Sequence, residues 1–131
     1  MRSAELRDGD RVVCERCLVA ATPLARMRGL LGRRSLASGE GLLLRPASSV
    51  HTFFMRFPID LVFLSAGGEV LKVVGSLPPW RLAAARSAKA VVELPAGEAG
   101  RRGIRVGDSL VLSREGSPDS GPAAGSEAVS T

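Results

Sequence analysis

The sequence predicts an α+β domain that is mostly β: a small curled sheet or a partly open β-barrel with one short N-terminal helix. Three observations predict this class. The apolar runs are short, turns rich in Gly and Pro separate them, and strands and helices do not alternate as a doubly wound parallel sheet requires. The 131 residues fit a single domain. We expect an N-terminal arm over 1–10, a compact domain over 11–114 and a disordered tail over 115–131.

The first third of the chain should form a strand and then the helix. Residues 11–20 predict a strand because they are rich in Val, Cys and Leu. Residues 22–31 predict a helix, since Thr22 can cap it, Pro23 suits its first turn and Gly32 can end it. Leucines and a methionine would share one face of this helix, with arginines on the other side.

The middle of the chain predicts short strands joined by turns. Residues 42–45 and 60–64 are apolar runs bounded by turn residues, and each predicts a buried strand. Pro58 has no amide hydrogen, so it should separate the second strand from the segment before it. Residues 65–68, Ser-Ala-Gly-Gly, are typical of a hairpin turn that returns through 69–74.

The last part of the domain alternates loops with short elements. A Pro-Pro-Trp sequence indicates an irregular loop over 75–81, and 82–89 is rich enough in Ala for a helical turn but lacks caps. Residues 90–94 predict a strand, 98–102 a short turn of helix, and 109–113 the last strand. Strands therefore outnumber helices throughout.

Composition limits the classes of partner. The net charge is +5, but the 18 Lys and Arg residues are spread along the chain, which has no Tyr and one Trp to stack on bases. This distribution disfavours nucleic acid. The chain begins with charged residues rather than a signal-peptide core, and its longest apolar runs are too short to span a bilayer. We therefore expect a cytoplasmic monomer with no membrane span.

Cys14 and Cys17 form a Cys-x-x-Cys pair, which is a weak indication of metal or redox chemistry. A structural zinc site needs a second pair of ligands, and a redox pair would open a helix. In a strand, residues three apart point to opposite faces, so the two thiols should not share a metal. We expect both to be small buried hydrophobes and, with a single histidine in the chain, no metal or other cofactor.

The segment 49–60 is the strongest candidate for a site, because polar residues are threaded through an apolar stretch. His51 and Asp60 are the best catalytic candidates: the imidazole could act as general acid or base while the carboxylate orients its ring. The separation of the two residues, with Pro58 between, would let their segments pair side by side. The alternative is a structural histidine that ties two strands together through Thr52, Asp60 or a backbone carbonyl.

Arginines near this segment suggest an anionic ligand. Guanidinium groups bind carboxylate and phosphate in two-point fashion, so Arg28 and Arg56 converging near His51 would suit a small anion. The alternative is that Arg56 pairs internally with Asp60 or Glu93 while the helix arginines face water. The candidate ligand-binding residues are Arg28, His51, Thr52, Met55, Arg56 and Asp60.

Two residues elsewhere also stand out. Asp108, after Gly107, should accept hydrogen bonds from neighbouring amides in a turn. Trp80 could be an exposed contact for a partner protein or a lid over the end of a barrel. Both alternatives for Trp80 are open at this point.

Several motifs together resemble a known family. They are 28–33 (RGLLGR), 41–44 (GLLL), 51–60 (HTFFMRFPID), 62–64 (VFL) with the Gly turn that follows, 93–97 (ELPAG) and 107–108 (GD). In this order and spacing, over about residues 11–113, they resemble the family called domain of unknown function 192 (DUF192). The resemblance implies a small, compact, β-rich fold found in bacteria and archaea. It implies no established activity.

The function that these residues favour is binding. We expect the edge that carries His51 and Asp60, with nearby arginines, to hold a small anionic ligand or a segment of a partner protein. One alternative is an acid–base enzyme that uses His51 on a phosphate or carboxylate substrate. Another is an accessory or assembly protein that acts through Trp80 and a sheet edge.

Overall fold

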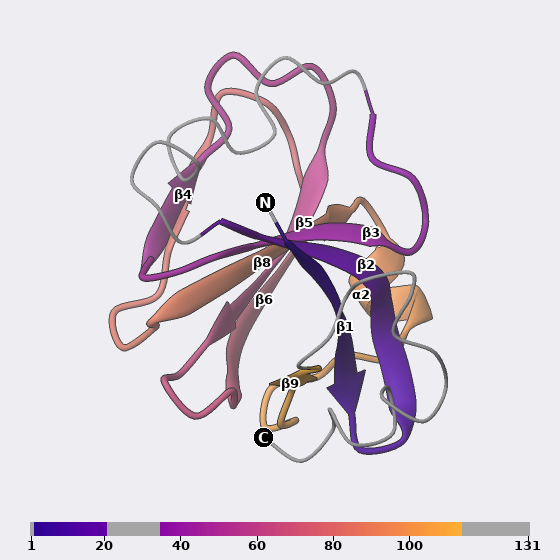
Figure 1. Ribbon diagram of the computed structural model, residues 1–131. Coiled ribbons are helices and arrows are strands. Elements are labelled where there is room, and N and C mark those ends of the chain that lie inside the picture. The colour runs from indigo at the N-terminus through magenta and orange to yellow at the C-terminus, as the bar shows by residue number, and fades with distance from the viewer. Residues whose placement is uncertain (1, 21–34, 114–131) are drawn as a thin grey trace.

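The computed structural model describes residues 2–20 and 35–113, which form nine strands and one short helix (Figure 1). In chain order, these elements are β1 (Ser3–Asp8), β2 (Arg11–Ala20), β3 (Glu40–Leu44), β4 (Ser49–His51), β5 (Ile59–Leu64), β6 (Val70–Leu77), β7 (Leu82–Ala84), β8 (Ala90–Pro95), α2 (Glu98–Arg101) and β9 (Val111–Leu112). The strands expected over 11–20, 60–64 and 90–94 are confirmed, as is the helical turn expected over 98–102.

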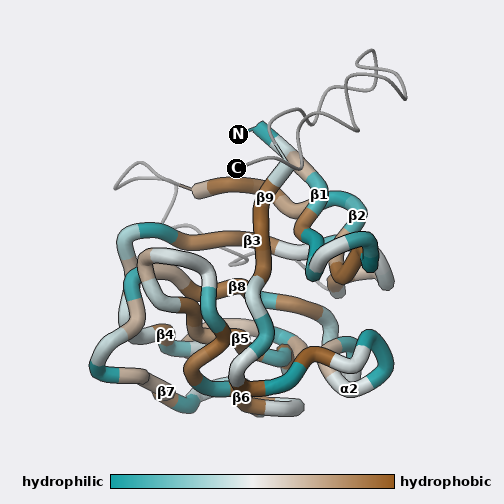
Figure 2. Tube along the Cα trace, turned by 90° about the horizontal axis from the view of Figure 1, so that it is seen from below, coloured by the Kyte–Doolittle hydropathy of each residue, from teal (hydrophilic) through white to brown (hydrophobic). Residues whose placement is uncertain are grey.

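Seven strands form one sheet in the order β6-β5-β8-β3-β2-β1-β9. Neighbours are antiparallel except β2 and β3, which run parallel. The mostly β class and the curled sheet are confirmed, but the sheet does not close into a barrel (Figure 1). β4 and β7 form a separate antiparallel ribbon, which lies on the opposite side of the molecule from α2 in Figures 1 and 2.

The two edges of the sheet come together at one corner without forming a ladder. Glu69 and Ser109 form an isolated antiparallel bridge, and the Leu110 amide donates to the Gly68 carbonyl at 2.8 Å. Gly68 has a φ of 95°, and a Cβ at this position would collide with the Leu110 carbonyl oxygen. The corner requires glycine, because the two backbones approach too closely for a side chain.

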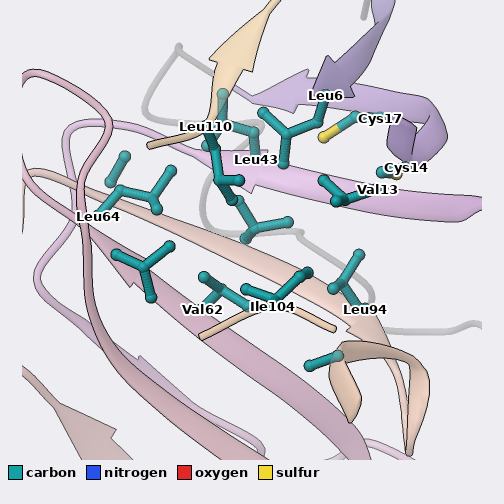
Figure 3. Close-up of a cluster of buried hydrophobic side chains, with 14 of the residues drawn as sticks. Leu6, Val13, Cys14, Cys17, Leu43, Val62, Leu64, Leu94, Ile104 and Leu110 are labelled. Atoms are coloured by element: carbon teal, nitrogen blue, oxygen red, sulfur yellow. The ribbon is translucent and has the colours of Figure 1, made fainter. Parts of the chain in front are cut away.

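Side chains on the two faces of the sheet pack into two apolar clusters. Successive residues of β5 point to opposite faces, so Val62 and Leu64 join one cluster while Leu61 and Phe63 join the other. Figure 3 shows the first cluster, to which most strands of the curled sheet contribute. Every residue of β5 and β8 is buried, which explains why these strands lack the polar alternation of a half-exposed strand.

Some expectations about the elements are wrong, and others fall outside the described residues. The arm expected over 1–10 contains β1, which pairs with β2 and buries Ala4 and Leu6 in the core. The ambiguous stretch over 82–89 contains β7 rather than a helical turn. The helix expected over 22–31 and the tail expected over 115–131 lie outside the described residues. Within those residues the helix is α2, towards the C-terminal end.

Cys14 and Cys17 are both buried in the first core cluster, as expected for small hydrophobes, but they share a face (Figure 3). The expectation of opposite faces is wrong because β2 contains a bulge. Ala4 pairs with Cys17 and Leu6 with Cys14, so between these pairs β2 has one residue more than β1. The extra residue shifts the alternation of side chains. A hydrogen bond with Cys14 and burial raise the pKa of the Cys17 thiol.

Candidate functional site

Two loops meet beside the β4–β7 ribbon, and Thr52 holds them together. Its amide donates to the Arg81 carbonyl at 2.8 Å, and its carbonyl accepts from the Trp80 amide at 3.0 Å. Its hydroxyl donates to the Pro78 carbonyl at 2.7 Å and accepts from the Arg81 amide at 2.8 Å. Thr52 is buried, and all its polar groups are paired within the protein. The loop after β4 and the loop before β7 therefore form one unit.

An exposed aromatic patch covers this unit. The name stands for His51, Phe53, Phe54, Trp80 and Leu82. Ring centroids lie 4.9 Å apart for His51 and Phe53 and 5.7 Å apart for Phe53 and Trp80. Those of Phe54 and Trp80 lie 4.7 Å apart, so the rings form one chain of favourable contacts. Four of the five large hydrophobic side chains exposed by the described residues belong to this patch.

Two residues of the patch have a strained backbone. Phe54 has a φ of 68° and Trp80 a φ of 67°, in the left-handed region that bulky residues rarely adopt. Each such residue costs on the order of 1–3 kcal/mol and persists only where surrounding contacts hold it. Here the bonds of Thr52 supply those contacts, yet Trp80 stays 55% exposed and Phe54 69% exposed. Strain that holds apolar rings in water is typical of a surface prepared for contact.

The segments that build the patch carry positive charge only. Residues 45–59 and 70–92 contain Arg and Lys but no Asp or Glu. Arg56 is exposed and, among the described residues, has no hydrogen bond or ion pair. Arg81 lies in sequence between two patch residues and is also exposed. The site thus combines apolar rings with guanidinium groups that no carboxylate of these segments neutralises.

The structure places the residues predicted for a ligand site in different environments. His51 is exposed on β4, and its ring belongs to the aromatic patch. Thr52 and Met55 are buried, the second in a core cluster, so their side chains do not face solvent. β4 pairs with β7, whereas the strand of Asp60 pairs with β6 and β8, so the expected pairing of the two segments is wrong. Arg28 lies outside the described residues.

Asp60 has a structural role. It is 1% exposed, and its Oδ1 accepts from the Ser76 amide at 2.7 Å and the Gly97 amide at 3.0 Å. Its Oδ2 accepts from the Ala99 amide at 2.9 Å. The carboxylate therefore ties β6 and the start of α2 to β5. Since its hydrogen bonds all go to backbone amides, it does not orient the ring of His51.

Glu93 is a second buried carboxyl, and one of its oxygens makes no hydrogen bond. On β8 it lies between Leu42 and Leu61 of the neighbouring strands, and its Oε1 makes no hydrogen bond. Burial raises the pKa of Glu93 to about 7. Arg56 pairs with neither this carboxyl nor Asp60, so the internal ion pair considered from the sequence is not formed.

The two other residues singled out in the sequence have clear positions. Asp108 accepts from the Arg105 amide at 2.9 Å, which confirms its role in the turn. Trp80 is exposed and is not a lid. The surface position of Phe53 and Phe54 was not foreseen, since aromatics in an apolar run predict a core. One signal in the sequence could have indicated this position. Because successive side chains of a strand point to opposite faces, Phe53 and Phe54 cannot both face the core of one strand.

The described residues assemble neither a metal-ligand group nor a carboxylate–imidazole pair. Within residues 2–20 and 35–113, no group of three His, Cys, Asp or Glu side chains could hold a metal ion. Among the described carboxylates none forms a hydrogen bond or ion pair with the His51 imidazole, and Asp60 binds backbone amides instead. The helix in the described part of the chain is also too short to cross a membrane.

The fold and site define the class as a small, mostly β domain with a curled sheet and an exposed aromatic patch beside it. Residues 4–112 match the model of DUF192, a family described as an uncharacterized ACR. The chain belongs to this family, so the resemblance seen in its motifs is confirmed.

Known relatives agree with this assignment. UPF0127 protein PF1050 of Pyrococcus furiosus is 41% identical over 68 residues, which cover 51% of this chain and 58% of that protein. The match thus spans less than two thirds of the relative's length. A Sinorhizobium meliloti 1021 structure, named as a candidate transcription regulator, has a TM-score of 0.73 at 24% identity and covers 85% of this chain and 92% of its own. A Novosphingobium aromaticivorans structure of unknown function has a TM-score of 0.69 at 24% identity, covering 83% of each chain. At this identity the two structures support the fold alone.

Proposed function

We propose that this protein is a binding module that holds a segment of a partner protein on the aromatic patch. The observation that carries the proposal is the chain of contacting rings that stays exposed on strained loops. The sequence has only four Phe and one Trp, and three of these five rings are in the patch rather than in the core. Large aromatic side chains dominate the energy of protein interfaces, and contiguous exposed apolar patches are uncommon on monomers.

The chemistry of the patch indicates which segment it would take. Apolar side chains would pack on Trp80 and Phe54, and acidic side chains would pair with Arg56 and Arg81. Among the described residues neither β4 nor β7 has a second neighbour in the ribbon. An extended segment could therefore add to an edge of this ribbon while its side chains reach the rings. We infer an extended partner segment with both apolar and acidic residues.

A peptide selection tests this proposal and needs no identified partner. Random peptides displayed on phage are selected against the immobilised full chain, and the enriched peptides are synthesised. They should combine acidic with aromatic or aliphatic residues. Because Trp80 is the single Trp of the chain, binding should change the intrinsic fluorescence of the protein directly.

Matched variants distinguish the patch from any other apolar surface. Trp80→Ala and Phe54→Ser should each weaken peptide binding at least about tenfold in calorimetry, as hot-spot truncations do. Val106→Ser alters the fifth exposed large hydrophobic side chain, which lies outside the patch, and should leave the affinity unchanged. The proposal fails if no peptide is enriched, or if the enriched peptides bind the Trp80 and Phe54 variants as tightly as the parent.

The other functions expected from the sequence have less support in the geometry. A small anion bound at His51 and Arg56 could not contact the other three residues predicted to bind it. The side chains of Thr52, Met55 and Asp60 are buried. An acid–base enzyme would have to work without the orienting carboxylate. Titration with inorganic phosphate separates these possibilities: a rise in thermal stability that Arg56→Ala abolishes would favour the anion site.

A further inference from the structure

We propose a second binding site, at one end of the curled sheet, for a single-chain amphiphile with an anionic head group. The site is separate from the aromatic patch, and no residue of the patch lines it. The proposal is therefore independent of the function proposed above. Three observations carry it: a cavity, its apolar walls and the charge of its rim.

The cavity has a volume of about 790 Å³ and opens beside the hairpin turn 65–68. Its accessible apolar walls include Pro46 and Ala66, which are exposed, and Val111 and Leu112 of β9, which are half-buried. Beneath them lie four buried leucine side chains, Leu6, Leu43, Leu64 and Leu110. Figure 3 shows these four side chains gathered in the first core cluster. The apolar interior of the curled sheet therefore continues into the floor of the cavity, and its size lies within the usual range of about 300–1,000 Å³ for ligand pockets.

The rim of the cavity is positively charged. Arg2, Arg45 and Lys89 all line it, and all three are exposed. Among the described residues none of these cations forms an ion pair with a carboxylate, and none of the described lining residues is Asp or Glu. Three cations that no described carboxylate pairs with attract an anion at this opening, and guanidinium groups bind carboxylate or phosphate in two-point fashion.

Apolar walls and a cationic rim fit a ligand with two parts. An acyl or alkyl chain would pack on the accessible apolar side chains of the walls, Pro46, Val111 and Leu112, while a carboxylate or phosphate head would remain at the rim beside the Arg45 and Lys89 side chains. A small anion alone would leave the apolar walls in contact with water. An uncharged alkyl chain would cover the walls but would give the cations of the rim no counter-charge. The shared chemistry of a fatty-acid carboxylate and an alkyl phosphate therefore defines the ligand class.

Calorimetry on the full chain tests the ligand class. Dodecanoate and dodecyl phosphate are titrated below the concentrations at which they aggregate, and the tighter of the two identifies the head group. Dodecyltrimethylammonium has the same chain and the opposite charge, and inorganic phosphate has the charge without the chain. We expect saturable binding of one or both anionic amphiphiles and at least about tenfold weaker binding of the two controls.

Variants locate the ligand. Ala66 is an exposed lining residue of the hairpin turn, so Ala66→Trp should obstruct the opening without disturbing the core and abolish binding. Arg45→Gln combined with Lys89→Gln should weaken binding about tenfold or more, since two charge-assisted contacts are lost.

Two controls separate this site from the patch and from a general effect of charge. Arg56→Gln combined with Arg86→Gln removes the same charge away from the cavity and should leave the affinity unchanged. Trp80→Ala should have no effect, whatever becomes of peptide binding. The proposal is overturned if neither anionic amphiphile binds, if the cationic amphiphile binds as well, or if Ala66→Trp binds like the parent.

Discussion

Thr52 is the residue on which the geometry of the aromatic patch depends most. One hydroxyl donates to the Pro78 carbonyl and accepts from the Arg81 amide, so it joins the two loops through both of its hydrogen-bonding functions. Valine has almost the same shape and neither function. The strained backbone of Phe54 and Trp80 persists only while such bonds are present.

We therefore predict that Thr52→Val loosens the patch while the sheet stays folded. Loss of the hydroxyl removes the part-buried hydrogen bonds to the Pro78 carbonyl and the Arg81 amide, which should cost about 1–3 kcal/mol in the free energy of unfolding. Urea unfolding measures the loss, and the fluorescence anisotropy of Trp80 should fall. Thr52→Ser keeps the hydroxyl and should restore most of both signals. Equal anisotropy in the valine variant and the parent would contradict this account.

Glu93 makes the stability of the protein depend on pH in an unusual direction. Burial raises the pKa of this carboxyl from 4.5 to about 7 in the folded state, so the folded protein holds the proton more tightly than the unfolded chain. Its contribution to stability is full below pH 4.5 and is lost as the pH rises through about 7. The difference is about 3 kcal/mol in the free energy of unfolding.

We expect the parent to be less stable at pH 8 than at pH 5, and Glu93→Gln to be less sensitive to pH across that interval. Urea unfolding at the two pH values measures this. Glu15 does not interfere, because its hydrogen bond to Arg102 lowers the pKa of its carboxyl and moves its titration to more acidic pH. If the variant lost as much stability as the parent, Glu93 would not be the group responsible.

At the scale of elements, the corner ahead of β6 and β9 joins the two edges of the curled sheet. The Gly68 carbonyl accepts from the Leu110 amide, and no side chain fits between the two backbones. The curl brings the two edges of the sheet together, although the ladder stops at one isolated bridge.

Gly68→Ala should therefore separate the two edges. Both the positive φ and the collision with the Leu110 carbonyl oppose the new methyl group, and we expect a loss of about 2 kcal/mol or more in the free energy of unfolding. Gly67→Ala is the matched control, since a Cβ there meets only the Ser65 hydroxyl at 4.0 Å. Amide hydrogen exchange should accelerate at Leu110 in the first variant and remain unchanged in the second.

The elements also show what the sequence could and could not predict. β5 and β8 were predictable because runs of mostly apolar residues suit strands buried on both faces, and β2 because it is rich in Val, Cys and Leu. β1 was missed because its two buried residues stand among charged ones. The bulge in β2 was also missed, since register shifts depend on the partner strand and leave no signal in the sequence of one strand.

The candidate site was predictable as a segment but not as a set of side chains. Polar residues within 49–60 correctly indicated that the segment is special, and Trp80 was recognised as a possible contact. The roles of Thr52 and Asp60 depend on carbonyls and amides far away in the chain, at Pro78, Arg81 and Gly97. Only the fold brings such groups together.

On the scale of the whole molecule, the two proposed sites lie on different parts of the fold. The aromatic patch belongs to the ribbon of β4 and β7, whereas the cavity lies where the turn 65–68 meets β1, β3 and β8. Both are bordered by cations that pair with no carboxylate of the described residues, so positive charge that is spread along the sequence is brought together at both proposed sites. Binding at both should weaken as salt concentration rises.

The measurement that most directly tests the central claim, that the aromatic patch is a partner-binding surface, is an NMR chemical-shift map of the backbone amides. The labelled full chain is titrated with the strongest peptide from the selection. Perturbed amides should concentrate in residues 50–56 and 78–84, with Trp80 among the largest changes, if the partner segment binds the aromatic patch. Perturbations that instead centre on residues 65–68 and Leu110, or that leave the Trp80 amide unchanged, would contradict this claim.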